Sequence, residues 1–391
     1  MNGALFLDVG QAQCPKKGER VCGDAFRSRK LPAENRVISV LADGLGSGLK
    51  ANVLATMTAT MGLKFVSADA QILPAAEIMM EALPVCRVRK ISYATFTIID
   101  CRMESRTRVI ELDNPPFILI RKGEPVDVPH RELVSPKHRD RVLRVSEFEM
   151  QPEDRIVAFT DGISQAGLGT DRHHLGWKRA GVAEFLCRRI AAAPTVSAQH
   201  LAEQLLREAL SQEADGCAGD DMTATVLYFR QPRRLLVLSG PPYDQARDTE
   251  YARLIDEFPG RRVICGGTTA NIVARILHRE IETVIDSGSR TLPAFSRMPG
   301  TDLVTEGILT LTRTAQLLEG DLQPGERNAA TSLVELFRES DLIEFVVGTR
   351  INEAHQDPTL PVDLEIRRNI IRRIAAALRD RLFKEVSVRF I

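Results

Sequence analysis

The chain has 391 residues, and its 52 lysine and arginine residues balance its 52 aspartate and glutamate residues. One hydrophobic core rarely serves a chain of this length, so we predict two domains. The balanced charge argues against a protein drawn to nucleic acid or to a membrane by its overall field. The sequence has no apolar run long enough to span a bilayer, and its seven scattered cysteines form no CxxC pair. These features predict a cytoplasmic protein.

The first 230 residues combine many strands with two helical zones. Apolar, β-branched runs predict strands such as 37–41, 154–159 and 223–229. Helices are predicted at 49–66 and over roughly 180–211, and the first is apolar almost all round, so we expect it to be largely buried. Because strand and helix do not alternate regularly, we predict an α+β sandwich for residues 1–230.

Aspartates recur in short turns beside the apolar runs of this region. They occur in the motifs GDAF (Asp24), ADGLGSG (Asp43), AFTDG (Asp161) and GDDMT (Asp220, followed by Asp221). Bare carboxylates at strand ends are expensive unless a cation or a partner neutralises them, and carboxylates are the ligands that hard cations prefer. The pattern predicts a metal site gathered from distant parts of the chain. The alternative is that each Asp-Gly pair merely forms a turn.

The four motifs, in this order, together with LDNPPFILIRKG at 112–123, resemble the metal-dependent protein phosphatases of type 2C. The resemblance is to the bacterial branch typified by stage II sporulation protein E, and it covers residues 18–229. It implies a β-sandwich flanked by helices with two Mn²⁺ or Mg²⁺ ions at one end. Asp43 would bridge the ions with help from the Gly44 carbonyl. The remaining implied ligands are Asp24, Asp161 and Asp220, with Asp221 as a supporting candidate.

The resemblance also implies an activity. The expected reaction is hydrolysis of phosphoserine or phosphothreonine on a regulatory protein by a metal-activated water, in signal transduction. An anti-sigma-factor antagonist is a natural substrate for this branch. Two positions depart from the family pattern, since Leu45 stands where many members carry histidine, and Asp113-Asn114 replace the usual glycine and histidine of the hairpin. A scaffold that binds phosphoproteins without hydrolysing them is the alternative.

Beyond a polar segment at 230–234 the pattern changes. Strand-like runs at 234–240, 261–267 and 343–349 alternate with helical runs such as 248–258 and 268–278. This alternation predicts a smaller α/β domain with a mainly parallel sheet over residues 235–391. We expect the domain to be regulatory or ligand-sensing. An independent small-molecule enzyme is another interpretation.

One turn in this second domain predicts a binding site. Gly266, Gly267, Thr268 and Thr269 follow a strand and open a helix, an arrangement that favours an anion such as a nucleotide or a phosphorylated metabolite. Thr268 or Thr269 is the expected N-cap. The alternative is that the glycines serve a tight turn in a domain that forms a homodimer or docks a partner.

Overall fold

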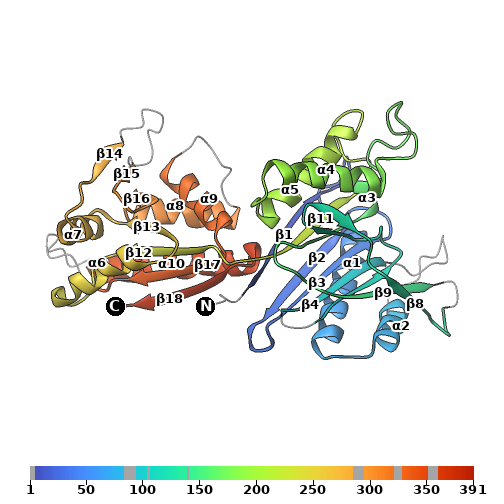
Figure 1. Cartoon of the computed structure of the whole chain (residues 1–391), viewed down its shortest axis with the longest axis horizontal. Helices are drawn as coiled ribbons and strands as arrows, with labels where there is room; N and C mark the ends of the chain where they lie inside the picture. Colours follow the sequence, from blue (N-terminus) through green and yellow to red (C-terminus); the bar gives the residue numbers. More distant parts are fainter. Residues whose placement is uncertain are drawn as a thin grey trace. The chain divides into compact units, whose positions relative to one another are not determined.

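A computed structural model of the chain divides it into two compact units, Met1–Gln231 and Pro232–Ile391, called unit one and unit two below (Figure 1). In the part of the chain that the structure describes, none of the helices is long and apolar enough to cross a membrane. The structure describes residues 5–82, 94–103, 106–138, 141–284, 295–320, 328–350 and 360–391.

Unit one contains two antiparallel sheets. The first has the strand order β1-β11-β10-β6-β7, and the second has the order β2-β3-β4-β5-β9-β8. The strands of the first sheet are β1 (Phe6–Cys14), β11 (Met222–Arg230), β10 (Arg155–Phe159), β6 (Ile118–Arg121) and β7 (Glu124–Val126). Those of the second are β2 (Ala25–Leu31), β3 (Arg36–Gly44), β4 (Ala94–Arg102), β5 (Arg106–Leu112), β9 (Val142–Glu149) and β8 (His130–Val134).

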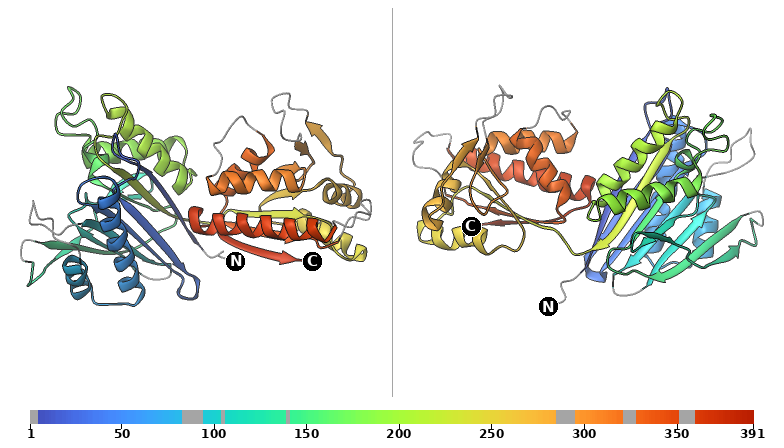
Figure 2. Two further views of the ribbon diagram at one scale, coloured as in Figure 1. Left: turned by 180° about the vertical axis from the view of Figure 1, so that it is seen from behind. Right: turned by 45° about the horizontal axis from the view of Figure 1, so that its top comes forward.

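Helices cover the outer faces of both sheets, as the views from two sides show (Figure 2). The helices of the second sheet are α1 (Gly48–Ser67) and α2 (Ile72–Ala82), after the short 3-10 turn η1 (Pro32–Glu34). The helices of the first sheet are α3 (Asp161–Ser164), α4 (Lys178–Ala192) and α5 (Ala198–Gln212). The result is a β-sandwich flanked by helices, so the fold class predicted for this region is confirmed.

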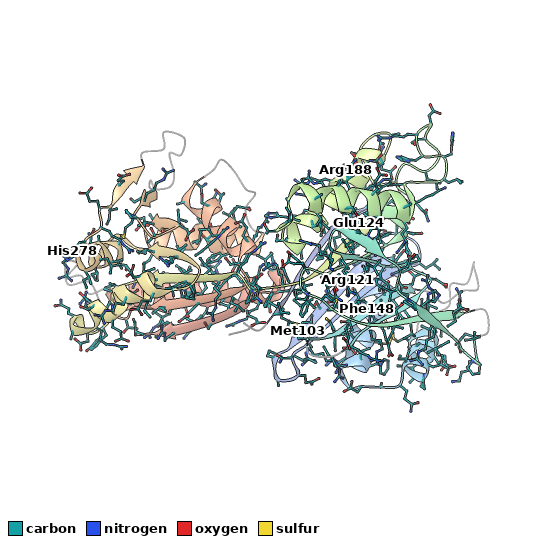
Figure 3. All side chains as sticks on the ribbon, in the orientation of Figure 1. Met103, Arg121, Glu124, Phe148, Arg188 and His278 are labelled. Atoms are coloured by element: carbon teal, nitrogen blue, oxygen red, sulfur yellow. The ribbon has the colours of Figure 1, made fainter. Side chains whose placement is uncertain are left out.

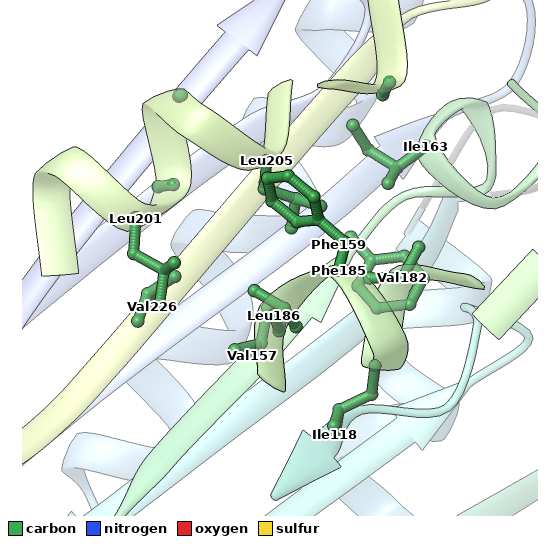
Figure 4. Packing of buried hydrophobic residues seen from close by; sticks show 14 of the residues in the cluster. Ile118, Val157, Phe159, Ile163, Val182, Phe185, Leu186, Leu201, Leu205 and Val226 are labelled. Atoms are coloured by element: carbon green, nitrogen blue, oxygen red, sulfur yellow. The ribbon is translucent and has the colours of Figure 1, made fainter. Parts of the chain in front are cut away.

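Strand β11 lies at the centre of this arrangement. All nine of its residues are buried. Alternate residues such as Met222 and Val226 pack into the core beneath α4 and α5, together with Phe159 and Leu205 (Figure 4). Because successive side chains of a strand point to opposite faces, the residues between them are buried on the other face of the sheet. The loop before β11 is therefore anchored to a strand that is buried on both sides.

A buried carboxylate fixes the beginning of β10. Arg121, at the end of β6, donates to Asp154 at 2.6 Å and to the carbonyl of Glu149 at 2.8 Å (Figure 3 labels Arg121). Asp154 also accepts from the backbone N–H of Gln151 at 2.8 Å. The strand that begins after this anchor ends at Phe159, directly before Thr160 and Asp161. It thereby places the third aspartate motif.

The prediction that the helix after Gly48 is largely buried is wrong. In α1 one face is buried, through small residues such as Ala51, Ala55 and Ala59. On the opposite face Leu49 is 68% exposed and Val53 is 49% exposed. Small residues let the helix lie close against β3, so a single face provides the contact and the larger apolar side chains are left in solvent.

Unit two contains one seven-stranded mixed sheet with the order β14-β15-β16-β13-β12-β17-β18. The five strands from β16 to β18 are parallel, and β14 and β15 pair antiparallel at one edge. The predicted α/β domain with a mainly parallel sheet is confirmed. Its strands are β12 (Arg234–Ser239), β13 (Arg261–Cys265), β14 (Glu282–Val284), β15 (Phe295–Arg297), β16 (Leu303–Thr305), β17 (Leu342–Val347) and β18 (Glu385–Phe390).

Helices cover both faces of this sheet and build two separate cores. On one face lie α6 (Asp248–Glu257), preceded by η2 (Gln245–Arg247), and α7 (Gly267–Leu277), which ends at the left-handed residue His278 (labelled in Figure 3). On the other face lie α8 (Ile308–Glu319), α9 (Ala329–Glu339) and α10 (Leu360–Leu382). Because the chain passes from β16 back past β12 to reach β17, the strand order reverses direction between β12 and β17.

Candidate metal centre

Asp43 lies at the end of β3, where it pairs with Thr95 of β4. The next residue, Gly44, packs against the first turns of α1. A Cβ atom at Gly44 would overlap the carbonyl oxygen of Ala51, so the close approach of α1 to β3 requires glycine there. The approach fixes the backbone beside Asp43 and directs the second aspartate motif to this end of the sandwich.

Asp24 is almost fully buried just before β2. Its exposed fraction is 1%, and its Oδ2 accepts a hydrogen bond of 2.8 Å from the hydroxyl of Thr160. That hydroxyl also accepts from the backbone N–H of Thr223 at 2.9 Å. Thr160 therefore joins the first aspartate motif to the third and fourth. Among the described residues, Asp24 Oδ1 is buried and has no hydrogen-bond partner.

Asp161 begins α3 directly after β10. Its Oδ2 accepts from the side-chain amide of Gln165, one helical turn on, at 2.8 Å. The following residue, Gly162, lies against the loop that leads into β11. A Cβ atom at Gly162 would overlap the carbonyl oxygen of Asp221, so this glycine sets how closely the third motif approaches the fourth.

The neighbours Asp220 and Asp221 occupy different environments. The Asp220 side chain is 45% exposed and lies 3.6 Å from the ammonium group of Lys16, a surface ion pair that contributes little stability. Asp221 is 4% exposed, and its Oδ1 accepts from the backbone N–H of Lys16 at 3.0 Å. In the part of the chain that is described, its Oδ2 is buried without a hydrogen-bond partner.

Mutual repulsion and burial shift the acidity of this group. Burial, and then the charges of the other four aspartates, raise the pKa of Asp43 to about 9. Burial raises the pKa of Asp24 to about 7, against the lowering effect of its threonine hydrogen bonds. Burial and the nearby Asp220 also raise the pKa of Asp161. Neighbouring carboxylates therefore oppose the ionisation of Asp43, Asp24 and Asp161, and a cation nearby would relieve that repulsion.

The donor set fits divalent metal ions in its chemistry. Among the described residues, the buried oxygens Asp24 Oδ1 and Asp221 Oδ2 lack hydrogen-bond partners, and the five aspartates come from four distant points of the sequence. Hard cations such as Mg²⁺ and Mn²⁺ take oxygen ligands of this kind. Within the described ranges, no three His, Cys, Asp or Glu side chains are arranged so that they could hold a metal ion. The described aspartates thus lie near one another without forming a ligand set as they stand.

Three supporting residues escaped the sequence interpretation. They are Thr160, which holds Asp24, Gln165, which holds Asp161, and Lys16, which contacts both Asp220 and Asp221. Thr160 and Gln165 flank the DG motif closely, and a polar residue one helical turn after a helix-opening aspartate is a usable signal. Lys16 carries no such signal, because its partners lie about 205 positions away along the chain.

The unusual hairpin residue Asn114 is part of the framework around the centre. Its side chain is buried, accepts from the Thr95 hydroxyl and donates to the Thr97 hydroxyl at 3.2 Å. Thr95 is the cross-strand partner of Asp43, so the hairpin is tied to the strand beside the candidate centre. Leu45, which stands in the position of the family's histidine, is half-buried and offers no proton.

The predicted anion site lies in unit two, at the turn between β13 and α7. Gly266 is the N-cap of α7, so Thr268 and Thr269 fall inside its first turn. The prediction of a threonine N-cap is therefore wrong, because the helix begins earlier than expected. Thr268 is exposed, whereas Thr269 is 1% exposed.

Replacing Gly162 with alanine should disturb both stability and the centre. The added methyl must push the loop at Asp221 away, and such overpacking costs about 1–3 kcal/mol. Turnover should fall about 10²-fold, the loss typical of a misplacement of about 1 Å. Urea unfolding and a phosphatase assay measure the two effects. Gly219→Ala is the matched control, since a Cβ there meets no atom nearer than 3.4 Å. Equal stability and equal turnover in Gly162→Ala and Gly219→Ala would contradict a close contact between Gly162 and the loop at Asp221.

Thr160→Val removes the hydroxyl but keeps the shape of the side chain. It leaves the Asp24 oxygen and the Thr223 N–H without this partner, and each buried unpaired group costs about 1–3 kcal/mol. We expect a clear loss of unfolding free energy in urea, whereas Thr160→Ser, which retains the hydroxyl, should stay close to wild type. A serine variant as unstable as the valine variant would show that the methyl group, not the hydrogen bonds, matters.

Comparison with known proteins identifies the family. Residues 33–230, just over half of the chain, match the family described as Stage II sporulation protein E (SpoIIE). The chain belongs to the SpoIIE family. The matched segment of this SpoIIE-family chain contains Asp43, Asp161, Asp220 and Asp221, whereas Asp24 precedes it.

Solved structures share the fold. The RsbU and RsbW domains of Rv1364c from Mycobacterium tuberculosis align with a TM-score of 0.50 at 18% identity, covering 71% of this chain and 75% of that one. The phosphatase domain of SpoIIE from Bacillus subtilis aligns at 0.44 and 18% identity, covering 59% and 95%. RsbX in complex with magnesium aligns at 0.38 and 19% identity, covering 57% and 95%. No curated protein sequence matches the SpoIIE-family chain significantly.

Proposed function

We propose that unit one is a metal-dependent protein phosphatase that removes phosphate from serine or threonine residues. The observation that carries this proposal is the gathering of five aspartates at one end of a phosphatase-type sandwich, with unpartnered buried oxygens on Asp24 and Asp221. Turn-forming aspartates would face solvent singly. Asp24 and Asp221 are instead buried near other carboxylates, which is unfavourable unless they serve a cation.

In this proposal Asp43 occupies the centre, because its pKa responds to all four of the other aspartates. It would contact both of two Mn²⁺ or Mg²⁺ ions, with the Gly44 carbonyl on one of them. Asp24, Asp161 and Asp220 would complete the ligand set. The two ions would supply an activated water and neutralise charge on the phosphoryl group during in-line displacement. Asp221 would support the set from its buried position.

The residues around the ligands hold them in place. Thr160 donates to Oδ2 of Asp24, whose Oδ1 has no hydrogen-bond partner among the described residues, and Gln165 donates to Oδ2 of Asp161. Removing a residue that orients a metal ligand in this way typically lowers metal affinity or activity about 10–100-fold. Because the Asp220 side chain is 45% exposed, Asp220 would lie on the open side of the centre, where a phosphorylated protein would have access.

The substrate we propose is a phosphorylated regulatory protein in a signalling pathway, with an anti-sigma-factor antagonist as the candidate that membership of the SpoIIE family favours. Unit two, which has hydrophobic cores of its own, is the proposed regulatory or sensing domain. The alternative is a module that binds phosphoproteins and does not turn them over.

Phosphate release from matched phosphoserine and phosphotyrosine peptides tests the activity and its residue class. We expect release from the phosphoserine peptide with Mn²⁺ or Mg²⁺, little release from the phosphotyrosine peptide, and none in a metal chelator. Binding of the phosphoserine peptide without any release would favour the module that binds only. Release that persists in chelator would contradict the metal-dependent mechanism.

A further inference from the structure

A polar groove lies on the α6–α7 face of unit two, away from the aspartate centre in sequence. Its volume is about 520 Å³, within the range of small-molecule sites. The polar side chains that line it come from η2, α6, α7 and the segment after β17. They include Gln245, Asp248, Thr268, Asn271, Arg275 and Arg350.

Asp248 is the buried carboxylate of this groove. It is 6% exposed, and its Oδ2 accepts from Arg275 at 2.9 Å. Arg350 lies 3.8 Å from Oδ1, too far for a hydrogen bond. Among the described residues, Oδ1 has no hydrogen-bond partner although it is shielded from solvent. A buried acceptor in a groove wall is satisfied when a ligand donates to it, as a hydroxyl group does.

Arg350 supplies the matching donor. Its side chain is 19% exposed, and its Nη1 is buried without a hydrogen-bond partner in the described part of the chain. With Arg275, two guanidinium groups face one carboxylate across the groove. The lining therefore carries a net positive charge, and the planar donors of arginine suit the oxygens of a phosphate group.

Helix α7 adds to this positive character. Its first turn begins at Gly267, and Thr268 and Asn271 of its early turns line the groove. Within the described residues, the Gly266 N-cap provides no side-chain cap, and the Thr269 hydroxyl is buried without a partner. An uncapped helix N-terminus carries partial positive charge and free N–H donors.

The topology places these groups where ligands of open α/β sheets bind. The strand order reverses between β12 and β17, and Asp248 and Arg350 follow these two strands in the chain. The carboxyl ends of strands at such a reversal form a crevice. The same region therefore combines Asp248 Oδ1 and Arg350 Nη1, which have no hydrogen-bond partners among the described residues, with a helix N-terminus from another part of unit two.

We propose that this groove binds a small phosphate ester that carries free hydroxyl groups, of the kind found in sugar phosphates and nucleotides. The phosphate would lie against Arg350, Arg275 and the start of α7, and a hydroxyl would donate to Asp248. A cation would be opposed by the two arginines. Inorganic phosphate alone would leave Asp248 Oδ1 without a hydrogen-bond donor. An apolar ligand would leave both Asp248 Oδ1 and Arg350 Nη1 without hydrogen-bond partners. This site is distinct from the proposed phosphatase centre and does not depend on it.

The test is calorimetric titration of the intact chain, in buffer free of divalent metal, with adenosine 5′-monophosphate, ribose 5-phosphate, adenosine and inorganic phosphate. Omitting metal removes turnover by unit one, so this result stands apart from the phosphatase assay. Two variants probe the groove. Asn271→Asp is isosteric and adds a negative charge at an exposed position, and Arg350→Gln removes the buried donor. Arg253→Gln, at an exposed position of α6 outside the groove, is the matched control.

We expect at least one ester to bind more tightly than both adenosine and inorganic phosphate. Its affinity should fall at least about tenfold in Asn271→Asp and in Arg350→Gln, as expected for repulsion of an anion and for loss of a charge-assisted hydrogen bond, and stay unchanged in Arg253→Gln. Binding of both esters would point to the sugar phosphate they share, and binding of the nucleotide alone to a contribution from the base. The proposal is overturned if neither ester binds, if inorganic phosphate binds as tightly as the esters, or if the groove variants keep wild-type affinity.

Discussion

Asp43→Asn should abolish metal-dependent phosphatase turnover, with a loss of at least about 10³-fold, the upper range for removal of one preorganised electrostatic group. Asp43 is the carboxylate whose pKa responds to all the others, so its charge is central to holding the cations. The amide keeps the size of the side chain, and the loss therefore reports charge rather than shape. Initial rates of phosphate release at saturating Mn²⁺ measure the effect.

The matched control is Asp171→Asn, which changes an exposed aspartate in the loop after α3. It should retain wild-type turnover.

The metal-free Asp43→Asn variant should also melt at a higher temperature than the metal-free wild type, because one half-buried carboxylate repelled by its neighbours has been replaced by a neutral amide. A variant that loses turnover and also loses stability would show that the substitution had damaged the fold, and the assignment of Asp43 would then rest on Asp161→Asn. Retained turnover in both of these variants would contradict the site.

Removal of metal should destabilise the chain, and increasingly so as the pH rises. A carboxyl group whose pKa is higher in the folded state binds more protons when folded, so stability falls as pH rises between its unfolded and folded pKa values. The window runs from the ordinary value of about 4 to about 7 for Asp24 and about 9 for Asp43. Above the window the repulsion is fully present, and bound cations should offset it.

Thermal unfolding in chelator at about pH 6 and about pH 8, with and without Mn²⁺, measures this linkage. We expect the metal-free melting temperature to be lower at the higher pH. We expect Mn²⁺ at a hundredfold excess over its dissociation constant to add about 2.7 kcal/mol for one site. Asp43→Asn should show a weaker pH dependence and a smaller gain from Mn²⁺. A melting temperature that rises with pH in chelator, or that does not change when Mn²⁺ is added, would contradict mutual repulsion of the aspartates as the source of the pH dependence.

The aspartate motifs were readable from the sequence because strand ends and Asp-Gly turns leave local signals. The structure places Asp24, Asp43 and Asp161 at one end of the sandwich, as the motif order implied. The contrast between exposed Asp220 and buried Asp221 was not readable, because it depends on the packing of Gly23 and Lys16 against that loop. That any of these five aspartates binds metal stays a prediction.

Helix α1 shows why burial could not be predicted from apolar content alone. Its sequence is apolar on nearly every side, yet contact with the sheet uses its small residues and leaves Leu49 and Val53 in solvent. Helix periodicity identifies which residues share a face of the helix. The face that packs on the sheet is the one whose small side chains let the helix come closest to the strands.

In unit two, alternation of strands and helices was enough to predict the parallel sheet, since parallel strands need crossover connections. The groove was not predictable in the same way. Asp248 and Arg350 are distant in sequence, and each is unremarkable in its local context. They meet because the strand order reverses between β12 and β17, a feature of topology that no local pattern encodes.

The most direct test of the central claim is phosphate release from a phosphoserine peptide by the intact chain, measured across a titration of Mn²⁺ into chelator-treated protein. The account predicts no release without metal and release that saturates with Mn²⁺, with no such activity in Asp43→Asn. Release that is independent of Mn²⁺, or equal in the wild type and the variant, would contradict a metal centre built on these aspartates.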